Sequence, residues 1–231
     1  MYPELVSANS LAEAIQLKIQ ELDLDLKCAR PKELDDFPVE FAIIEKGNKF
    51  SQIYIGGEKR IFLPDFWRNG VCLANGGTDN LNELVKAIDL WINSNVSTEN
   101  LTQQFGFIEP DKCAQYFDNQ EEIEYKWNIY LNDEHLQKIG MVDFMLEAIK
   151  VERIKNLFPF TSVSRLCLSQ TTGYPYQSNF PIVVALENKM YQLRDQKNTL
   201  IVEGDLNTVL NKWLEFIPSD IARARPGTAD D

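Results

Sequence analysis

Residues 157–218 read LFPFTSVSRLCLSQTTGYPYQSNFPIVVALENKMYQLRDQKNTLIVEGDLNTVLNKWLEFIP, and this stretch decides the fold. Short apolar runs separated by Gly, Pro, Asn and Asp predict four strands, over 165–170, 182–186, 190–193 and 199–202. Gly204 and Asp205 then precede a helix over 206–217, whose apolar residues recur at helical spacing and which Pro218 ends. The stretch therefore predicts an antiparallel β-meander closed by an amphipathic helix.

The same order of elements occurs earlier in the chain. Ser10 and Glu13 form a capping box ahead of a helix over 11–22. The following apolar runs predict strands over 39–45, 51–55, 60–63 and 71–74, with the first turn at Gly47-Asn48. Asp79 is the expected N-cap of the next helix, over 81–92. Matching elements of the two halves are separated by a nearly constant offset, which indicates a duplicated unit.

We therefore predict an α+β fold with two tandem helix–antiparallel β-meander–helix units joined by a helical connector. The first unit is expected over 1–95, the connector over 96–140, and the second unit, with its C-terminal tail, over 141–231. The second unit is expected to open with one helix over 141–156. The tail after Pro218 is expected to be ordered at first and then to fray.

The chain is acidic. Its 231 residues carry 35 acids and 23 bases, a formal net charge of −12. Nucleic-acid affinity depends largely on Lys and Arg that neutralise phosphates, so this balance disfavours nucleic acid and, for the same reason, anionic membranes. It suits a basic protein partner, although solubility alone also explains it.

No apolar run is long enough to span a bilayer, and the first residues, MYPELVSANSLAEA, lack the basic and apolar regions of a secretory signal. The sequence contains no C-x-x-C pair, so we expect buried thiols rather than disulfides and a cytoplasmic protein. The cysteines are Cys28, Cys72, Cys113 and Cys167.

Catalytic and cofactor motifs are not apparent. His135 is the only histidine and lies in a polar stretch, typical of a surface residue. The glycine pairs Gly56-Gly57 and Gly76-Gly77 are typical of turns, and no phosphate-binding glycine motif occurs. We therefore predict no enzymatic activity, no catalytic residues, no metal and no cofactor.

Acids and aromatics cluster in the middle of the chain. Asp118, Glu121, Glu122 and Glu124 fall close together, followed by Tyr125 and Trp127. Such acids usually form a solvated helix face, or else a ridge that meets a partner; a catalytic pair is the third alternative. Acids beside aromatics also suit an interface with an aromatic anchor and a charged rim, whereas Trp127 equally suits a core position.

The most distinctive loop is TTGYPY, residues 171–176. Gly173 permits positive φ, and Pro175 restricts Tyr174 to extended conformations. Tyr174 and Tyr176 are therefore either a recognition surface or a cover over the end of the sheet. With the acids and aromatics above, they complete the candidate partner-binding residues.

Several segments resemble a bacterial family of unknown function whose members carry the label "natural product biosynthesis protein". The similar segments are EYKWNIYL at 124–131, LFPFTS at 157–162, LSQTTGYPY at 168–176 and PGTADD at 226–231, with looser similarity in YPEL at 2–5 and DLWI at 89–92. The resemblance implies a stand-alone soluble domain and supplies no active-site residues. The charge and the middle of this chain depart from the family.

From these features we expect an acidic binding protein, in its concrete form an immunity protein that occludes the basic active cleft of a cognate bacterial toxin. Carboxylates placed in that cleft would mimic phosphate and exclude substrate. The alternative is an enzyme or accessory protein of natural-product biosynthesis. A scaffold that dimerises through a sheet edge is a third hypothesis.

Overall fold

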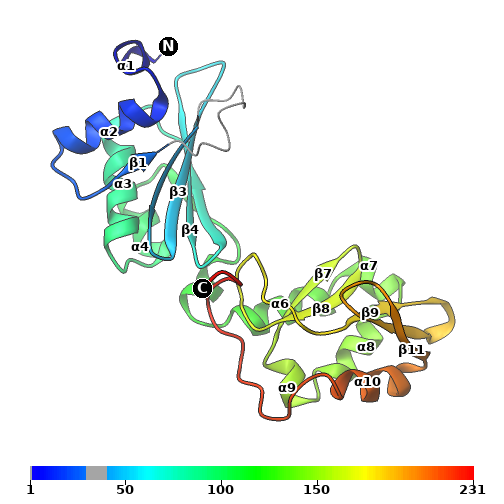
Figure 1. Ribbon diagram of the computed structural model, residues 1–231. Helices are drawn as coiled ribbons and strands as arrows, with labels where there is room; N and C mark the ends of the chain where they lie inside the picture. Colours follow the sequence, from blue (N-terminus) through cyan, green and yellow to red (C-terminus); the bar gives the residue numbers. More distant parts are fainter. Residues whose placement is uncertain (1, 30–40) are drawn as a thin grey trace. The chain divides into compact units, whose positions relative to one another are not determined.

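The computed structural model describes residues 2–29 and 41–231 and has the α+β fold expected from the sequence (Figure 1). The chain forms two compact units, residues 1–119 (unit 1) and 120–231 (unit 2). The division falls within 96–140, the stretch in which we predicted a helical connector. Each unit has its own sheet and helices.

Unit 1 contains an antiparallel sheet in the order β1-β2-β3-β4-β5-β6, so neighbouring strands follow one another along the chain. Gly47 and Asn48 form the predicted two-residue turn, with Gly47 at φ +63° and Lys46 opposite Lys49. Residues 39 and 40 of the predicted first strand lie outside the described residues. The strands are β1 (Cys28–Ala29), β2 (Phe41–Lys46), β3 (Lys49–Ile55), β4 (Phe62–Arg68), β5 (Val71–Gly76) and β6 (Ile108–Pro110).

The helices of unit 1 are α1 (Pro3–Ser7), α2 (Leu11–Glu21), α3 (Leu81–Asn93), α4 (Thr98–Gln104) and α5 (Ala114–Asp118). Helices α2 and α3 contact each other and cover one face of the sheet. Ser10 caps α2 as predicted, accepting from Glu13 N at 3.2 Å. The prediction that Asp79 caps α3 was wrong. Asn80 is the N-cap, and its Oδ1 accepts hydrogen bonds from the backbone nitrogens of residues 82 and 83.

Unit 2 repeats the meander in a sheet of order β11-β10-β9-β8-β7. The strand Phe158–Ser162 (β7) escaped prediction because Pro159 lies within it. Proline cannot donate to a sheet ladder, and the edge position of β7 tolerates it. The strands are β7, β8 (Arg165–Ser169), β9 (Ile182–Ala185), β10 (Tyr191–Arg194) and β11 (Leu200–Gly204).

The helices of unit 2 are α6 (Glu122–Leu131), α7 (Glu134–Lys138), α8 (Met141–Ala148), α9 (Glu152–Lys155) and α10 (Leu206–Leu214), with a short 3-10 turn at Glu187–Lys189. The prediction of one helix over 141–156 was wrong. Helix α8 ends at Ala148, and Val151 adopts φ −92° and ψ 111° before α9 begins. A β-branched residue is well suited to this extended conformation.

Each unit fixes its closing helix with a buried tryptophan. Trp91 in α3 and Trp213 in α10 have no exposed surface. Trp91 Nε1 donates to Trp67 O at 3.1 Å, and Trp213 Nε1 donates to Pro181 O at 2.9 Å. The corresponding anchors support the predicted pair of tandem helix–meander–helix units.

Cys28, Cys72 and Cys167 are thiols inside or beside the strands. Burial raises their pKa, to about 12 for Cys28 and about 11 for Cys72 and Cys167. They are therefore protonated and unreactive at neutral pH. No helix within residues 2–29 and 41–231 has the length and apolar character needed to cross a lipid bilayer.

Candidate functional site

The acids at the start of α6 differ in their surroundings. Glu121 and Glu124 are exposed, whereas Glu122 is buried. Glu124 accepts two hydrogen bonds from the Arg223 guanidinium, at 2.9 and 2.8 Å. These bonds hold the pKa of Glu124 below its usual value. Acids in a first turn are also favoured by the helix dipole, so the cluster has a local structural role as well as surface charge.

Trp127 is a core residue rather than an exposed anchor. Its side chain is 4% exposed, and Nε1 lies 3.2 Å from both Lys155 O and Leu157 O. The tryptophan thus fixes α6 against the chain that enters β7. Tyr125 is half-buried on the same helix.

The two loop tyrosines lie beside β7. The Tyr176 ring stacks on Phe160 with centroids 4.5 Å apart, and the Phe158 centroid is 5.7 Å away. Burial raises the pKa of Tyr176. Tyr174 meets the edge of Tyr176 and remains 70% exposed. The sequence left a recognition surface and a structural cover as alternatives for these two tyrosines. Tyr176 packs against β7 as a cover would, whereas Tyr174 projects into solvent.

A buried polar turn holds this loop. Ser169 Oγ donates to Thr171 O at 2.7 Å and accepts from Thr171 N at 2.9 Å. Thr171 Oγ1 accepts from Gln177 N at 2.9 Å. Both side chains are completely buried. These bonds close the base of the loop and restrict the positions available to Tyr174.

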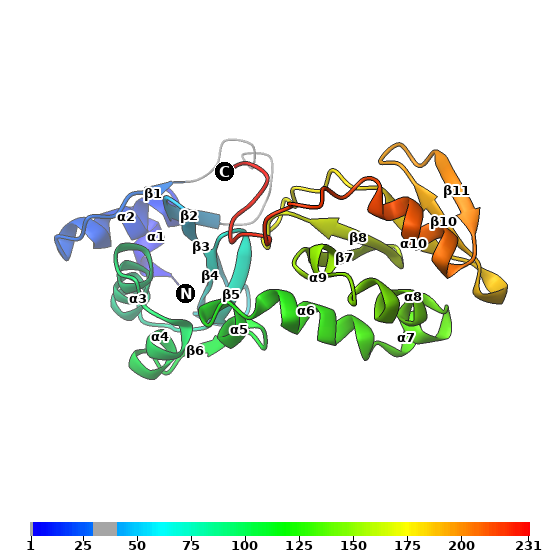
Figure 2. The same cartoon turned by 90° about the horizontal axis from the view of Figure 1, so that it is seen from below.

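The C-terminal tail, residues 218–231, holds the other side of the loop. Figures 1 and 2 show it in red, running from α10 past α9. Thr172 N donates to Arg225 O at 3.0 Å, Gly173 N to Gly227 O at 2.9 Å, and Ala229 N to Pro175 O at 2.7 Å. The expected fraying of the tail was therefore wrong over residues 224–229. Its role escaped prediction because these partners are far apart in sequence.

The structure thus gathers most candidate residues in one part of unit 2, where α6, β7, the loop 171–176 and the tail meet. We call the exposed part of this region, Glu121, Glu124 and Tyr174 with the half-buried Tyr176, the tyrosine surface. Two of the segments behind the family resemblance, 124–131 and 168–176, contain residues of the tyrosine surface. Arg223 belongs to the same region and was missed from the sequence.

Asp118 belongs to unit 1 and has a different environment. Its Oδ1 lies 2.5 Å from Arg68 Nη2, and its Oδ2 accepts from Thr98 N at 2.8 Å. The Asp118 and Arg68 side chains are only 11% and 15% exposed. Asp118 therefore joins α5 to β4 and to the start of α4.

A pocket of about 670 Å³ lies beside this ion pair, between α4 and α5. Glu99 and Asp111 contribute carboxylates to its lining, Lys112 contributes one ammonium group, and Thr102 and Gln115 contribute neutral polar groups. A polar lining of this kind suits a small polar ligand or a basic side chain.

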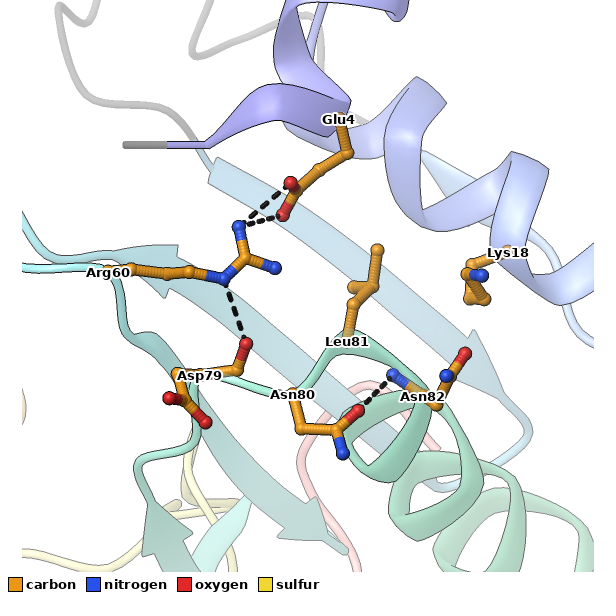
Figure 3. Close-up of a pocket in the computed structure, with 7 residues that line it drawn as sticks. All are labelled: Glu4, Lys18, Arg60, Asp79, Asn80, Leu81 and Asn82. Carbon is orange, nitrogen blue, oxygen red and sulfur yellow. Dashed lines mark hydrogen bonds and ion pairs between the residues drawn. The ribbon is translucent and has the colours of Figure 1, made fainter.

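A second pocket of unit 1, about 480 Å³, lies at the start of α3 (Figure 3). Arg60 dominates its rim: Nη1 lies 2.7 Å from Glu4 Oε1, and Nε donates to Asp79 O at 2.9 Å. The guanidinium also lies against the Tyr2 and Phe62 rings. Arg60 is thus already engaged and joins α1 to the sheet.

His135 Nε2 lies 2.8 Å from Ser164 Oγ, at the turn between β7 and β8. His135 is exposed, as expected. Among residues 2–29 and 41–231, no cluster of three His, Cys, Asp or Glu side chains is arranged to hold a metal ion.

By architecture the chain is an α+β protein of two tandem units, with an acidic and aromatic surface on the second. Residues 121–221 match a family model described as a family of unknown function (DUF6193), and this match carries no biosynthetic label. The matched span covers most of unit 2 and none of unit 1. No curated protein and no solved structure matches the chain.

Proposed function

We propose that this chain is an acidic binding protein, an immunity protein that occupies the basic active cleft of a cognate bacterial toxin. The carrying observation is Tyr174, an aromatic side chain 70% exposed on a loop held from both sides. Aromatic residues are frequent hot spots at interfaces, and an anchor that is already ordered loses little conformational entropy on binding.

The charge distribution supports a basic partner. Residues 1–119 carry 19 acids and 11 bases, and residues 120–231 carry 16 acids and 12 bases. Both units therefore attract a basic protein over a distance set by ionic strength. Within the tyrosine surface, Glu121 and Glu124 lie at the start of α6, and α6 packs against β7, which contacts Tyr176 of the loop that carries the anchor. In a cleft built for phosphate, such carboxylates would pair with the Lys and Arg side chains that substrate needs.

The test is a growth assay with the product of the adjacent reading frame. That product is expected to be basic and to stop growth when it is expressed alone, and co-expression of this chain is expected to restore growth. Tyr174→Ser is expected to weaken protection and binding at least tenfold, whereas Tyr116→Ser, in unit 1, serves as a control for loss of a tyrosine. A neighbour that is harmless, or remains toxic with this chain present, would refute the proposal.

A second candidate is a role in natural-product biosynthesis, as enzyme or accessory protein. The pocket between α4 and α5 favours it, because its size fits a small ligand. The measurement is the melting temperature of the chain with a panel of polar metabolites, compared for wild type and Gln115→Leu. A rise seen in wild type and lost in the variant supports this role; no rise with any compound removes its support.

A further inference from the structure

We propose that unit 2 contains a slot for an extended, arginine-bearing peptide segment, and that the C-terminal tail occupies this slot in cis. The slot consists of Glu124, Asn156 and the loop residues 170–173. The inference rests on the proposed function only for the source of the segment, the basic partner, which would displace the tail.

The tail meets the slot as an added parallel strand would. Thr171 and Arg225 form a parallel bridge. Arg225 N donates to Gln170 O at 3.0 Å, and Arg225 O accepts from Thr172 N at 3.0 Å. Two residues on, Gly227 O accepts from Gly173 N at 2.9 Å. In parallel pairing, a residue hydrogen-bonds to the residues before and after its partner on the neighbouring strand, as Arg225 does here with residues 170 and 172. Peptide capture by strand addition uses the same pairing.

Backbone pairing carries no sequence preference, but the two flanking contacts do. Glu124 accepts hydrogen bonds from Arg223 Nη1 and Nη2 at 2.9 and 2.8 Å, a two-point pairing that lysine cannot reproduce. The next residue, Ala224, donates its N–H to Asn156 O at 2.9 Å and is 6% exposed. The slot therefore selects an arginine followed by a small residue.

The tail is exchangeable because little side-chain surface holds it. Only Ala224 and Gly227 are buried between 219 and 231; Arg223, Arg225 and Pro226 are exposed. The Arg223–Glu124 pair is itself exposed, with side chains 43% and 53% accessible. Exposed pairs contribute little to stability, and the backbone hydrogen bonds are available to any extended segment. A partner segment with the same chemistry can therefore replace the tail.

The test uses a fluorescein-labelled synthetic peptide with the sequence of residues 219–231, SDIARARPGTADD, titrated with the full chain and followed by anisotropy. Wild type is expected to bind it weakly, because its own tail fills the slot. The full-chain variant Arg223→Glu is expected to bind at least tenfold tighter, since its tail is repelled by Glu124. Lys212→Glu, an equal charge change on α10, is the control and should bind as wild type does.

Two further titrations address the arginine. A peptide with Ala in place of Arg223 is expected to lose about twofold to fivefold in affinity for the Arg223→Glu chain, the range expected for an exposed ion pair. The double variant Arg223→Glu/Glu124→Arg should close the slot again and bind the original peptide no better than wild type. Absence of peptide binding by the Arg223→Glu chain, or equal binding of both peptides, would overturn the slot. Either result leaves the growth assay untouched, so failure here is separable from failure of the proposed function.

Discussion

The tryptophan of the closing helix meets an aromatic ring in both units, Phe66 in unit 1 at 6.0 Å and Phe144 in unit 2, but the tryptophan of unit 1 also has two cationic side chains over its ring. Lys49 Nζ and Arg68 Cζ lie 5.0 and 5.6 Å from the Trp91 ring centroid. In unit 2, the Phe144 centroid lies 5.8 Å from that of Trp213 and 5.1 Å from that of Tyr191.

The difference shows which feature of the repeated unit is structural. In both units the indole N–H donates to a backbone carbonyl outside its own helix, and this bond fixes the helix whatever lies beside it. Lys49 is almost buried, and its Nζ donates to Trp91 O at 2.9 Å and Ser94 O at 2.6 Å, which satisfies the C-terminal end of α3. The pKa of Lys49 is lowered, and burial is the main cause.

The largest expected effect comes from removing the shared anchor. Trp213→Ala and Trp91→Ala should each lower the free energy of unfolding by about 3–5 kcal/mol, because each leaves a cavity and loses a buried indole. Trp213→Ala should cost more, since its cavity is apolar, whereas water can solvate the charges beside Trp91. Urea unfolding followed by circular dichroism measures both free energies of unfolding. Losses under about 1 kcal/mol would contradict the role of the two tryptophans as anchors of their helices.

Asp118→Asn should have the next largest effect. It leaves Arg68 nearly buried without a charged partner, and breaking such a pair typically costs about 3–5 kcal/mol. The matched control is Asp111→Asn, whose side chain lies on the pocket rim and whose loss should cost less than about 1 kcal/mol. Equal losses for the two variants would show that the Arg68 pair is unimportant.

Glu124→Gln tests the exposed ion pair of unit 2 and should cost only about 0.2–1 kcal/mol at low salt. The folded-state pKa of Glu124 is lowered from 4.5, so its contribution is present above that value and is lost as the pH falls through the folded-state pKa. The difference from wild type should therefore shrink below pH 4.5 and in high salt. A difference unchanged by acid and salt would contradict an electrostatic origin.

Asp65→Asn should have the smallest effect, with the opposite sign. Burial raises the pKa of Asp65 from 3.8, so the charged form opposes folding at neutral pH. The variant should gain up to about 0.5 kcal/mol at pH 7 and nothing at pH 3, where the wild-type carboxyl is protonated in both states. Urea midpoints at the two pH values decide; Glu109→Gln, an exposed edge residue, is the control.

The sequence predicted the repeated order of elements because strand and helix periodicities are local. The helical spacing of apolar residues also predicted both closing helices, which carry Trp91 and Trp213. The Asp118–Arg68 and Glu124–Arg223 pairs could not be predicted, since each joins residues far apart in sequence. For the same reason the sequence left Trp127 as either a core residue or an interface anchor. The structure shows that it is a core residue, hydrogen-bonded to the carbonyls of residues 155 and 157.

Every hydrogen-bonded strand pair in both sheets joins strands consecutive along the chain. Sheets of this topology fold rapidly, because each strand pairs with a neighbour in the sequence and few distant segments must meet. On the ribosome, unit 1 can complete its sheet as soon as β6 has emerged, while unit 2 is still being synthesised. Residues 223–229 are synthesised after every strand of unit 2, so the strands beside the peptide slot can pair before the tail is available to fill it.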